Sequence, residues 1–255
     1  MTRIVNIGEA LIDEITRPNT APVEVVGGSM LNVAAGLTRL GHDCELATWF
    51  ADDARGAKVR EHAENAGVTL IPGSDAAEFT TVAHASLDER GRATYEFDLS
   101  WDVPAVNDPD TVGHVHTGSY AVAVQPGGEK VLAAVKRQAI RGTVSYDPNI
   151  RPALLGTPDE ARPHVEAIVA LADVVKASDE DLEWLYPGRP VEDVIREWSQ
   201  SGPALIVCTR GPWGVYIKTE AERDMLVVDP LDVELVDTVG AGDSSVAGYV
   251  LADVR

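Results

Sequence analysis

The residues best suited to chemistry stand near the end of the chain, in the run Asp237-Thr-Val-Gly-Ala-Gly-Asp243-Ser. The residues that follow, 245–251, are compatible with a helix. Glycines directly before a helix leave its first N–H groups open, and the helix dipole makes that end attractive to an anion. An acid in the first turn, here Asp243, would face the same anion. From the residues alone, the segment fits an anion-binding site and an ordinary acidic helix N-terminus equally well.

The overall charge limits which partners the chain can hold. It has 255 residues with 21 Lys+Arg and 41 Asp+Glu, which gives a formal net charge of −20. A surface this acidic repels the phosphate backbone of nucleic acids, so no nucleic-acid partner is expected. A phosphorylated ligand must therefore be held locally, by backbone N–H groups, a metal ion or a few placed Arg and Lys.

Several familiar kinds of site are missing from the sequence. It has no GxxxxGK(S/T) run and no GxGxxG after the first strand, so P-loop and dinucleotide-binding sites are not supported. Cys44 and Cys208 lie far apart, which argues against a disulfide framework and for a reducing, cytoplasmic setting. Neither a signal-peptide-like run nor an apolar stretch of about 18 residues occurs, so neither secretion nor a membrane partner is expected. The pair His114 and His116 fits a buried pair better than a metal site, because no third ligand is apparent.

The elements that must position these residues alternate between strand and helix. Residues 4–7 predict a strand that ends at Gly8, and residues 29–40 have helical spacing with Ser29 as a candidate N-cap. The same rhythm predicts strands at 44–49, 68–71, 114–117, 144–147, 174–176 and 204–208, and helices at 53–66, 128–139, 159–171, 179–185 and 191–199. Such alternation predicts an α/β fold with a parallel sheet flanked by helices.

Two parts of the chain break this rhythm. Residues 80–87 and 92–97 are β-prone and flank Asp88-Glu-Arg-Gly91, which is typical of a hairpin turn. Together with strands within 11–26 they predict a separate antiparallel flap, formed by 11–26 and 80–98. A further hairpin, 215–218 with 225–228, leads to the last helix.

Six segments, in the same order along nearly the whole chain, resemble the motifs of the ribokinase-like (PfkB) carbohydrate kinases. The run 237–243 resembles the DTxGAGD signature, and Gly27-Gly28-Ser-Met-Leu-Asn32-Val-Ala34 resembles GGxxxNxA. The other four are Gly8-Glu-Ala-Leu-Ile-Asp13, Asp147-Pro-Asn149-Ile-Arg151-Pro, Lys176-Ala-Ser178-Asp-Glu180-Asp181 and Thr209-Arg-Gly211-Pro-Trp-Gly214. They are similar to the opening strand with its sugar-contacting aspartate, to DPNxRP, to KxSxEE and to the TxGxxG nucleotide loop. The resemblance implies one ribokinase-like domain over residues 1–255, with a Rossmann-like three-layer α/β core and a small β-sheet lid.

The resemblance also implies catalytic roles. Asp243 is expected to be the general base for the attacking sugar hydroxyl. An aspartate with a pKa of roughly 3.9 is too weak to deprotonate an alcohol beforehand, so it must orient the hydroxyl and take its proton late. Arg151 is expected to be a cationic partner for phosphate or for a sugar carboxylate. The charge on the transferred phosphoryl group is expected to be stabilised by the backbone N–H groups of Gly240, Ala241, Gly242 and Asp243.

The remaining motif residues are expected to bind the two substrates and metal ions. The sugar is expected to contact Asp13, Gly27, Gly28, Asn32 and Asn149, with Tyr95 or Phe97 covering it. The nucleotide, ATP, is expected to contact Lys176, Ser178, Thr209, Gly211 and Gly214. Mg²⁺ is expected with the ATP, kept through water by Glu180 and Asp181. Asp237 and the carbonyl of Val239 match positions that hold a monovalent cation, K⁺, in ribokinase relatives.

These motifs predict an ATP-dependent kinase acting on a primary sugar hydroxyl, with fructose as the first substrate because the GExLID opening and DPNxRP occur together. The alternatives are a 2-keto-3-deoxygluconate kinase, whose substrate carboxylate needs positive charge from Arg151 or from Arg90 and Arg92, and a catalytically silent sugar-binding protein of the same fold. A nucleoside kinase is disfavoured, since nothing on the lid indicates a base-stacking site. The edge strands of the lid also predict a homodimer.

The chain departs from the family pattern at its C-terminal end. Family members continue for some tens of residues beyond the GAGD helix, where they add helices and part of the adenine pocket. This sequence stops at Arg255. The C-terminal part of the family fold is therefore expected to be absent from it, which would leave nucleotide binding incomplete.

Overall fold

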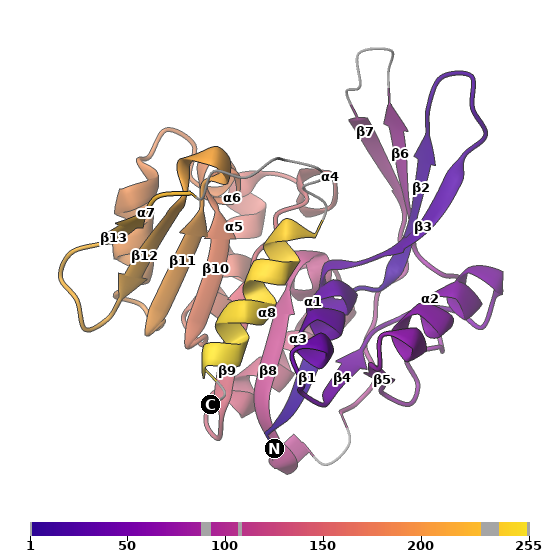
Figure 1. Cartoon of the computed structure of the whole chain (residues 1–255), viewed down its shortest axis with the longest axis horizontal. Coiled ribbons are helices and arrows are strands. Elements are labelled where there is room, and N and C mark those ends of the chain that lie inside the picture. The colour runs from indigo at the N-terminus through magenta and orange to yellow at the C-terminus, as the bar shows by residue number, and fades with distance from the viewer. Residues whose placement is uncertain (1, 88–92, 107–108, 231–239, 254–255) are drawn as a thin grey trace.

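A computed structural model describes residues 2–87, 93–106, 109–230 and 240–253 and contains two sheets (Figure 1). The large sheet has nine strands in the order β13-β12-β11-β10-β9-β8-β1-β4-β5. Its strands are β1 (Arg3–Ile7), β4 (Cys44–Ala47), β5 (Thr69–Leu70), β8 (Val112–Gly118), β9 (Thr143–Asp147), β10 (Val174–Ser178), β11 (Leu205–Thr209), β12 (Val215–Thr219) and β13 (Leu226–Val228). The strands from β5 to β11 are parallel, whereas β12 and β13 are antiparallel additions at one edge. This α/β arrangement confirms the predicted fold class.

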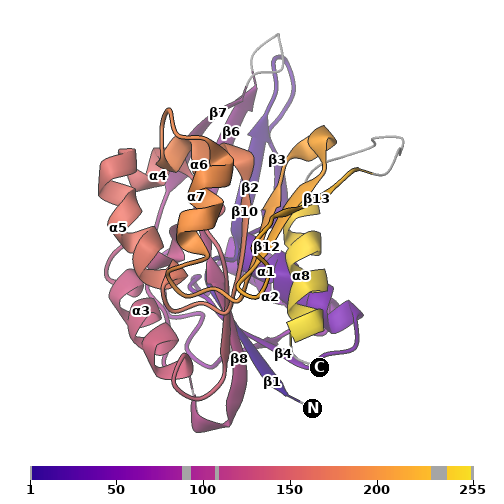
Figure 2. The ribbon, with the colours of Figure 1, turned by 90° about the vertical axis from the view of Figure 1, so that its left-hand side faces the viewer.

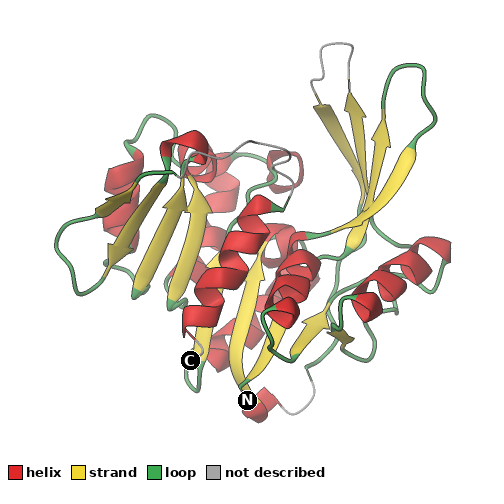
Figure 3. Ribbon diagram, viewed as in Figure 1, coloured by secondary structure: helices red, strands yellow, loops and turns green. Residues whose placement is uncertain are grey.

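Helices cover both faces of the large sheet, which gives three layers (Figures 2 and 3). The helices are α1 (Ser29–Arg39), α2 (Ala54–Asn65), α3 (Gly127–Gln138), α4 (Pro152–Leu155), α5 (Pro158–Val169), α6 (Asp179–Leu185), α7 (Val191–Trp198) and α8 (Ala241–Asp253), with short 3-10 turns η1 (Pro109–Thr111), η2 (Ser119–Val122) and η3 (Gly211–Trp213). One core packs α3, α5, α6 and α7 on the sheet, and the other packs α1, α2 and α8 on its opposite face. In the described part of the chain, no helix is long and apolar enough to cross a bilayer.

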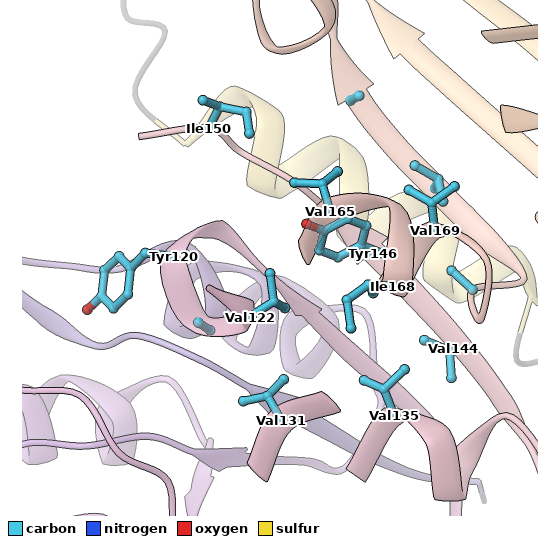
Figure 4. Packing of buried hydrophobic residues seen from close by; sticks show 14 of the residues in the cluster. Tyr120, Val122, Val131, Val135, Val144, Tyr146, Ile150, Val165, Ile168 and Val169 are labelled. Carbon is cyan, nitrogen blue, oxygen red and sulfur yellow. The ribbon is translucent and has the colours of Figure 1, made fainter. Parts of the chain in front are cut away.

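Strand β9 shows how the alternation of side chains serves both layers. Val144 and Tyr146 are buried in the core under α3 and α5, where they pack with Val165 and Ile168 (Figure 4). The alternate residues of β9 face the other layer, because successive side chains of a strand point to opposite faces. Asp147 ends the strand on that second face and is buried. One face of β9 therefore packs in the hydrophobic core, and the other face carries the buried carboxylate of Asp147.

The small sheet has the order β3-β2-β6-β7 and projects beside the main body (Figure 1). Its strands are β2 (Leu11–Thr16), β3 (Val23–Gly27), β6 (Val82–Leu87) and β7 (Ala93–Asp98). They match the predicted ranges to within one residue, and β2–β3 and β6–β7 pair antiparallel as predicted. The pair β2 and β6 is parallel, however, so the prediction of a wholly antiparallel flap was wrong. The reason is topological: α1, β4, α2 and β5 lie between these strands, and a crossover of that length permits parallel pairing. The predicted turn at 88–91 lies outside the described residues.

The strand order also creates one edge where several loops converge. The chain runs from β1 outward to β4 and β5, then returns to β8 on the other side of β1 and continues to β11. Parallel sheets bind ligands beyond the carboxyl ends of the strands where the order reverses in this way. The residues there include Glu9, Ser119 and Asn149, which follow β1, β8 and β9, and Ser178, which ends β10.

A polar network lies within the second layer, on β8 and β9. His114 and Ser145 are hydrogen-bonded with an Nε2–Oγ distance of 2.8 Å, and His116 Nδ1 lies 2.8 Å from the same hydroxyl. Burial lowers the pKa of His114 to about 4 and that of His116 to about 3. No group of three or more His, Cys, Asp and Glu in the described ranges is arranged to hold a metal ion. The two histidines are thus a neutral, buried pair.

The buried state of His116 predicts a pH-dependent contribution to stability. The folded pKa, about 3, lies below the unfolded value of about 6.5, so the contribution is present above pH 6.5 and is lost as the pH falls. Between pH 7 and pH 5 the stability advantage of the wild type over His116→Gln is expected to shrink by about 2 kcal/mol. Urea unfolding at both pH values measures it. The exposed His164→Gln serves as control, and an advantage that stays constant with pH contradicts the prediction.

Candidate active site

Asp243 lies in the first turn of α8, where two side chains of α1 hold its carboxylate. Ser29 Oγ donates to Oδ1 at 2.7 Å, and Asn32 Nδ2 donates to Oδ2 at 2.8 Å. The carboxylate is largely buried, with 9% of the residue exposed. Helices α1 and α8 pack side by side over the same face of the sheet (Figure 1). The two signatures, more than 200 residues apart in sequence, therefore meet at one carboxylate whose oxygens have fixed directions.

Ser29 has a different place from the one predicted. The sequence predicted it as the N-cap of α1, but the N-cap is Gly28, and Ser29 is the first residue of the helix. With φ of 113° at Gly28, the chain enters the helix in a conformation that a residue with Cβ rarely adopts. The Ser29 hydroxyl is thereby free to reach across to Asp243 instead of capping its own helix. No local pattern in the sequence reveals this contact.

The two signature glycines allow the small sheet to approach the site closely. A Cβ on Gly27 would lie 2.1 Å from Asp13 Oδ2, and one on Gly28 would lie 2.5 Å from the carbonyl oxygen of Glu9. Asp13 sits on β2 and is half-buried; burial raises its pKa, and the charge of Arg151 opposes that shift. The pairing Asp13–Ala83–Phe97 across β2, β6 and β7 places Phe97 on the same face as Asp13. An acid and an aromatic ring thus share the face of the small sheet that carries Gly27.

Lys176 is a buried cation next to this constellation. Its ammonium lies 3.0 Å from Asp147 Oδ2, and the two side chains are 7% and 1% exposed. Burial raises the pKa of Asp147 to about 6, and the charge of Lys176 opposes the shift. Burial alone lowers the pKa of Lys176, but the carboxylates of Asp147, Asp181 and Asp243 outweigh it, so its pKa is raised. At neutral pH the pair is therefore ionised, and the ammonium lies in the field of three carboxylates.

The start of α8 brings backbone donors to the same place. The first helical hydrogen bond runs from Ser244 N to Gly240 O, so the N–H groups of Ala241, Gly242 and Asp243 precede the helical ladder. A Cβ built on Gly242 would lie 3.1 Å from Lys176 Nζ. The helix N-terminus thus lies over a buried ammonium. Both attract an anion, and Asp243 stands beside them.

Replacing Gly242 with Val tests this arrangement. The new side chain presses on Lys176 and covers the N–H groups at the start of α8, whereas the sugar-side residues keep their places. We expect kcat to fall at least about tenfold with little change in sugar affinity, since loss of even one oxyanion donor costs about 10²-fold. Steady-state kinetics and calorimetric sugar titration measure the two quantities. Gly248→Val, at a position on α8 where a Cβ meets open space, is the matched control; equal losses in both variants would contradict the prediction.

The loop after β9 is held in place by a residue of α6. Asp181 accepts from Ile150 N and from Ser178 N, both at 2.8 Å, and Ser178 Oγ accepts from Asp181 N in a capping box. Both oxygens of Asp181 are thus engaged with backbone, which gives this residue a structural role in the loop. Its neighbour Glu180 is exposed in the first turn of α6. The contact of this acidic pair with a hydrated metal stays a prediction.

Arg151 and Asn149 form a local unit in that loop. Asn149 has a φ of 37°, and its Oδ1 accepts from Arg151 Nη1 at 2.9 Å. Its backbone N donates to Asp147 Oδ1 at 3.2 Å, which links the loop to the buried ion pair. Arg151 is exposed, and its charge lowers the pKa of Glu9 and of Asp13 against the effect of burial. The guanidinium therefore lies close to Asp13, the acid of the predicted sugar site, and to Glu9.

The predicted nucleotide residues gather at the ends of β10 and β11. Ser178 and Thr209 are paired in register, and Thr209 Oγ1 donates to Ala177 O at 3.4 Å. Gly211 is the first residue of η3. Gly214 lies so close to Val228 that a Cβ on Gly214 would be 2.0 Å from the carbonyl oxygen of Val228. Together with Lys176 on β10, these residues lie at the part of the sheet edge where β10 and β11 end. Predicted positions outside the described residues are Asp237, Val239, Arg90 and Arg92.

Sequence reasoning gave no functional role to Glu9, Ser29 or Asp147, although each lies in a quoted motif and Ser29 was predicted as a helix N-cap. Glu9 is 4% exposed and lies directly beyond β1. The sequence did carry a signal for Glu9 and Asp147. Glu9 comes just after an apolar parallel strand and Asp147 ends one, and such acids lie at the edge of the sheet where ligands bind.

Comparison with known proteins agrees with this geometry. Residues 1–254 match the family described as pfkB family carbohydrate kinase. A fructokinase of Rhizobium leguminosarum bv. trifolii is 33% identical, over 97% of this chain and 78% of its own length. The crystal structure of apo fructokinase from Vibrio cholerae O395 superposes with a TM-score of 0.79 at 26% identity, covering 98% of this chain and 88% of that one. A mutant of the same enzyme with fructose, ADP and a potassium ion gives 0.80 at 26% identity, covering 98% and 83%. The chain, with both family signatures joined at Asp243, belongs to the pfkB family of carbohydrate kinases.

Proposed function

We propose that this protein is a fructokinase that transfers the γ-phosphoryl group of ATP to a primary hydroxyl of fructose. The observation that carries the proposal is the Asp243 carboxylate, fixed by Ser29 and Asn32 beside the start of α8. The fructokinases among the relatives, and the neighbour bound to fructose, ADP and potassium, support the choice of substrates.

In this mechanism Asp243 orients the attacking hydroxyl and receives its proton as the new P–O bond forms. With Oδ1 and Oδ2 each already accepting one hydrogen bond, each oxygen retains a lone pair for the substrate. The N–H groups of residues 241–243 and the Lys176 ammonium offset the charge on the phosphoryl group. Asp13 and Asn32 hold sugar hydroxyls on the small-sheet side.

Mg²⁺ fits this site as a partner of the nucleotide. Mg²⁺ is commonly bound by phosphates, water and one or two carboxylates rather than by an all-protein cage. The exposed carboxylate of Glu180 fits such water-mediated contact, and the described residues offer no three-ligand cluster. When bound, Mg²⁺ neutralises phosphate charge. A K⁺ role for Asp237 remains part of the proposal.

The charges around Arg151 favour fructose over 2-keto-3-deoxygluconate. A substrate carboxylate needs an uncommitted cation. Arg151 faces two acids, Asp13 and Glu9, and is hydrogen-bonded to Asn149. Its guanidinium is thus already hydrogen-bonded within its own loop and lies near two acids, which suits a neutral sugar. A coupled ADP-release assay across fructose, 2-keto-3-deoxygluconate, ribose and adenosine tests the proposal: fructose should give the highest kcat/KM, and no turnover of any sugar would favour a silent sugar-binding protein.

The small sheet is proposed to act as a lid and as the surface for a homodimer. The face that carries Asp13 also carries the half-exposed side chains of Val23, Val25 and Tyr95. An apolar sheet face of this kind is suited to cover the sugar and to meet a second copy. Light scattering after gel filtration tests the dimer, and a monomer at high concentration would remove it.

A further inference from the structure

Glu9 is a buried acid that the proposed mechanism does not use. It follows β1 at the ligand edge of the large sheet and is 4% exposed. One carboxylate oxygen, Oε1, accepts from Ser29 N at 3.3 Å. The other, Oε2, is buried and has no hydrogen-bond partner among the residues that the structure describes. A buried acceptor is rarely left unpaired, so Oε2 calls for a hydrogen-bond partner beyond those that the described residues show.

Ser119 presents a second unpaired group beside Glu9. It begins η2, directly after β8, which pairs with β1. Its Oγ is also buried and makes no hydrogen bond of normal geometry in the described structure, although the hydroxyl is near enough to the Glu9 carboxyl to lower the pKa of that group as a weak donor. Ser119 has a φ of 52°, a left-handed conformation that is uncommon for serine. Strained backbone of this kind concentrates at ligand sites.

The surroundings place this pair at the sugar side of the site. The carbonyl of Glu9 packs against Gly28 of the first signature. The Glu9 carboxyl lies in the fields of Arg151 and Asp243. Ser29 links them directly, because its N–H donates to Glu9 and its hydroxyl donates to Asp243. The unpaired Oε2 of Glu9 and the Ser119 hydroxyl thus lie next to Ser29, the residue that holds the proposed base Asp243.

We propose that Glu9 and Ser119 form a further sugar subsite, which receives a hydroxyl of the substrate other than the one that is phosphorylated. Oε2 of Glu9 accepts a hydrogen bond from that hydroxyl, and Ser119 Oγ donates to its oxygen. This proposal rests on the proposed sugar-kinase function and deepens it: the pair determines which sugars are selected. A site built to bind a hydroxyl rejects analogues that lack it, because its own buried groups are then left unpaired.

The ionisation of Glu9 gives the subsite a second signature. Burial raises the pKa of Glu9 to about 7; the charge of Arg151 opposes the shift and that of Asp243 adds to it. Tyr120 of η2 also faces the carboxyl, and its own pKa is raised well above 10, so it stays neutral in this range. The stronger acceptor is the ionised form, so sugar kcat/KM should rise as the pH passes through about 7. Glu9→Gln should remove that part of the profile.

The substitution Glu9→Gln is suited to the test because Ser29 fixes its orientation. Ser29 N–H requires an oxygen opposite it, so the amide NH₂ falls at the place of Oε2. The acceptor is lost while the contact to α1 remains. For fructose we expect kcat/KM to fall about 10- to 100-fold, the range for a hydrogen bond to a charged group. Ser119→Ala should give a smaller loss in the same direction.

A double-mutant cycle, with enzyme variants on one side and deoxy substrates on the other, distinguishes a direct contact with the sugar from a purely structural role of Glu9 and Ser119. The wild type, Glu9→Gln and Ser119→Ala are assayed with fructose and with a series of deoxyfructoses that each lack one hydroxyl. One analogue should abolish the effect of both substitutions, because the partner hydroxyl is already gone. The control is Glu45→Gln. This partly exposed glutamate lies on β4 and pairs with Arg3 of β1, and its substitution should leave the ratio of kcat/KM between fructose and each analogue unchanged.

Equal losses on fructose and all analogues would overturn the proposal and leave Glu9 as a support for Ser29. Should Glu9→Gln fail to fold, Ser119→Ala alone decides by the same criterion. If the wild type turns over another sugar and not fructose, the proposed function is wrong, and the cycle is run with deoxy analogues of that sugar. If no sugar is turned over, the same cycle is read from calorimetric sugar affinities.

Discussion

The substitution Asp243→Asn is expected to lower kcat for the best sugar at least about 10²-fold while sugar affinity changes little. General-base catalysis is typically worth about 10²–10⁴, and the substitution removes only the proton acceptor. Asparagine keeps the size of the side chain and one oxygen, which can accept from the Asn32 NH₂ as before. Its NH₂ group can donate to the Ser29 hydroxyl, which accepts as well as donates, so Asn32 keeps its orientation. Steady-state kinetics and calorimetric titration with the sugar measure the two effects.

The matched control is Asp159→Asn, an exposed aspartate in the first turn of α5 that pairs with Arg162. It changes the charge at a helix N-terminus equally and should leave kcat within about twofold, as surface substitutions do. Near-normal kcat in Asp243→Asn would show that the base lies elsewhere, with Asp13 next in line. A parallel loss of sugar affinity would instead indicate that Asp243 mainly holds Asn32 in place.

The elements of the large sheet were predictable because its strands are apolar runs bounded by glycine and acids. Helix α6 occupies the predicted range, 179–185, since Ser178 and Asp181 are a capping box that the sequence displays. The parallel pairing of β2 with β6 was not predictable in the same way. The period of two is identical in parallel and antiparallel strands, so the alternation of side chains carries no information about direction.

The candidate site, like the fold, has parts that local sequence predicts and parts that it does not. Motif glycines and Asp243 could be named from local sequence, but their partners could not. Ser29 meets Asp243 only because α1 and α8 lie on one face, and Asp147 meets Lys176 only because β9 and β10 are neighbours. Such contacts depend on strand order, which is a property of the whole fold. Asn149 shows the converse: named as a sugar contact, it holds Arg151 in the structure, and its contact with sugar stays a prediction.

Replacing Lys176 with Met is expected to lower the free energy of unfolding by about 3–5 kcal/mol, the usual cost of leaving one partner of a buried pair alone. Asp147, 1% exposed, would remain among the carboxylates that Lys176 offsets. Its pKa, about 6 with the ammonium present, must then rise further. A folded pKa above the unfolded value makes stability fall as the pH increases. The deficit of Lys176→Met should therefore be larger at pH 8 than at pH 6.

Urea unfolding followed by tryptophan fluorescence measures these free energies. The double variant Asp147→Asn with Lys176→Met should recover part of the loss, because it removes the buried charge and not only its partner. Lys218→Met is the matched control: this lysine is equally buried, but it donates to the carbonyls of Thr219 and Glu222, so its removal leaves no unpaired charge. A loss in Lys176→Met no larger than in Lys218→Met, or no recovery in the double variant, would show that the ion pair with Asp147 adds no stability of its own to the fold.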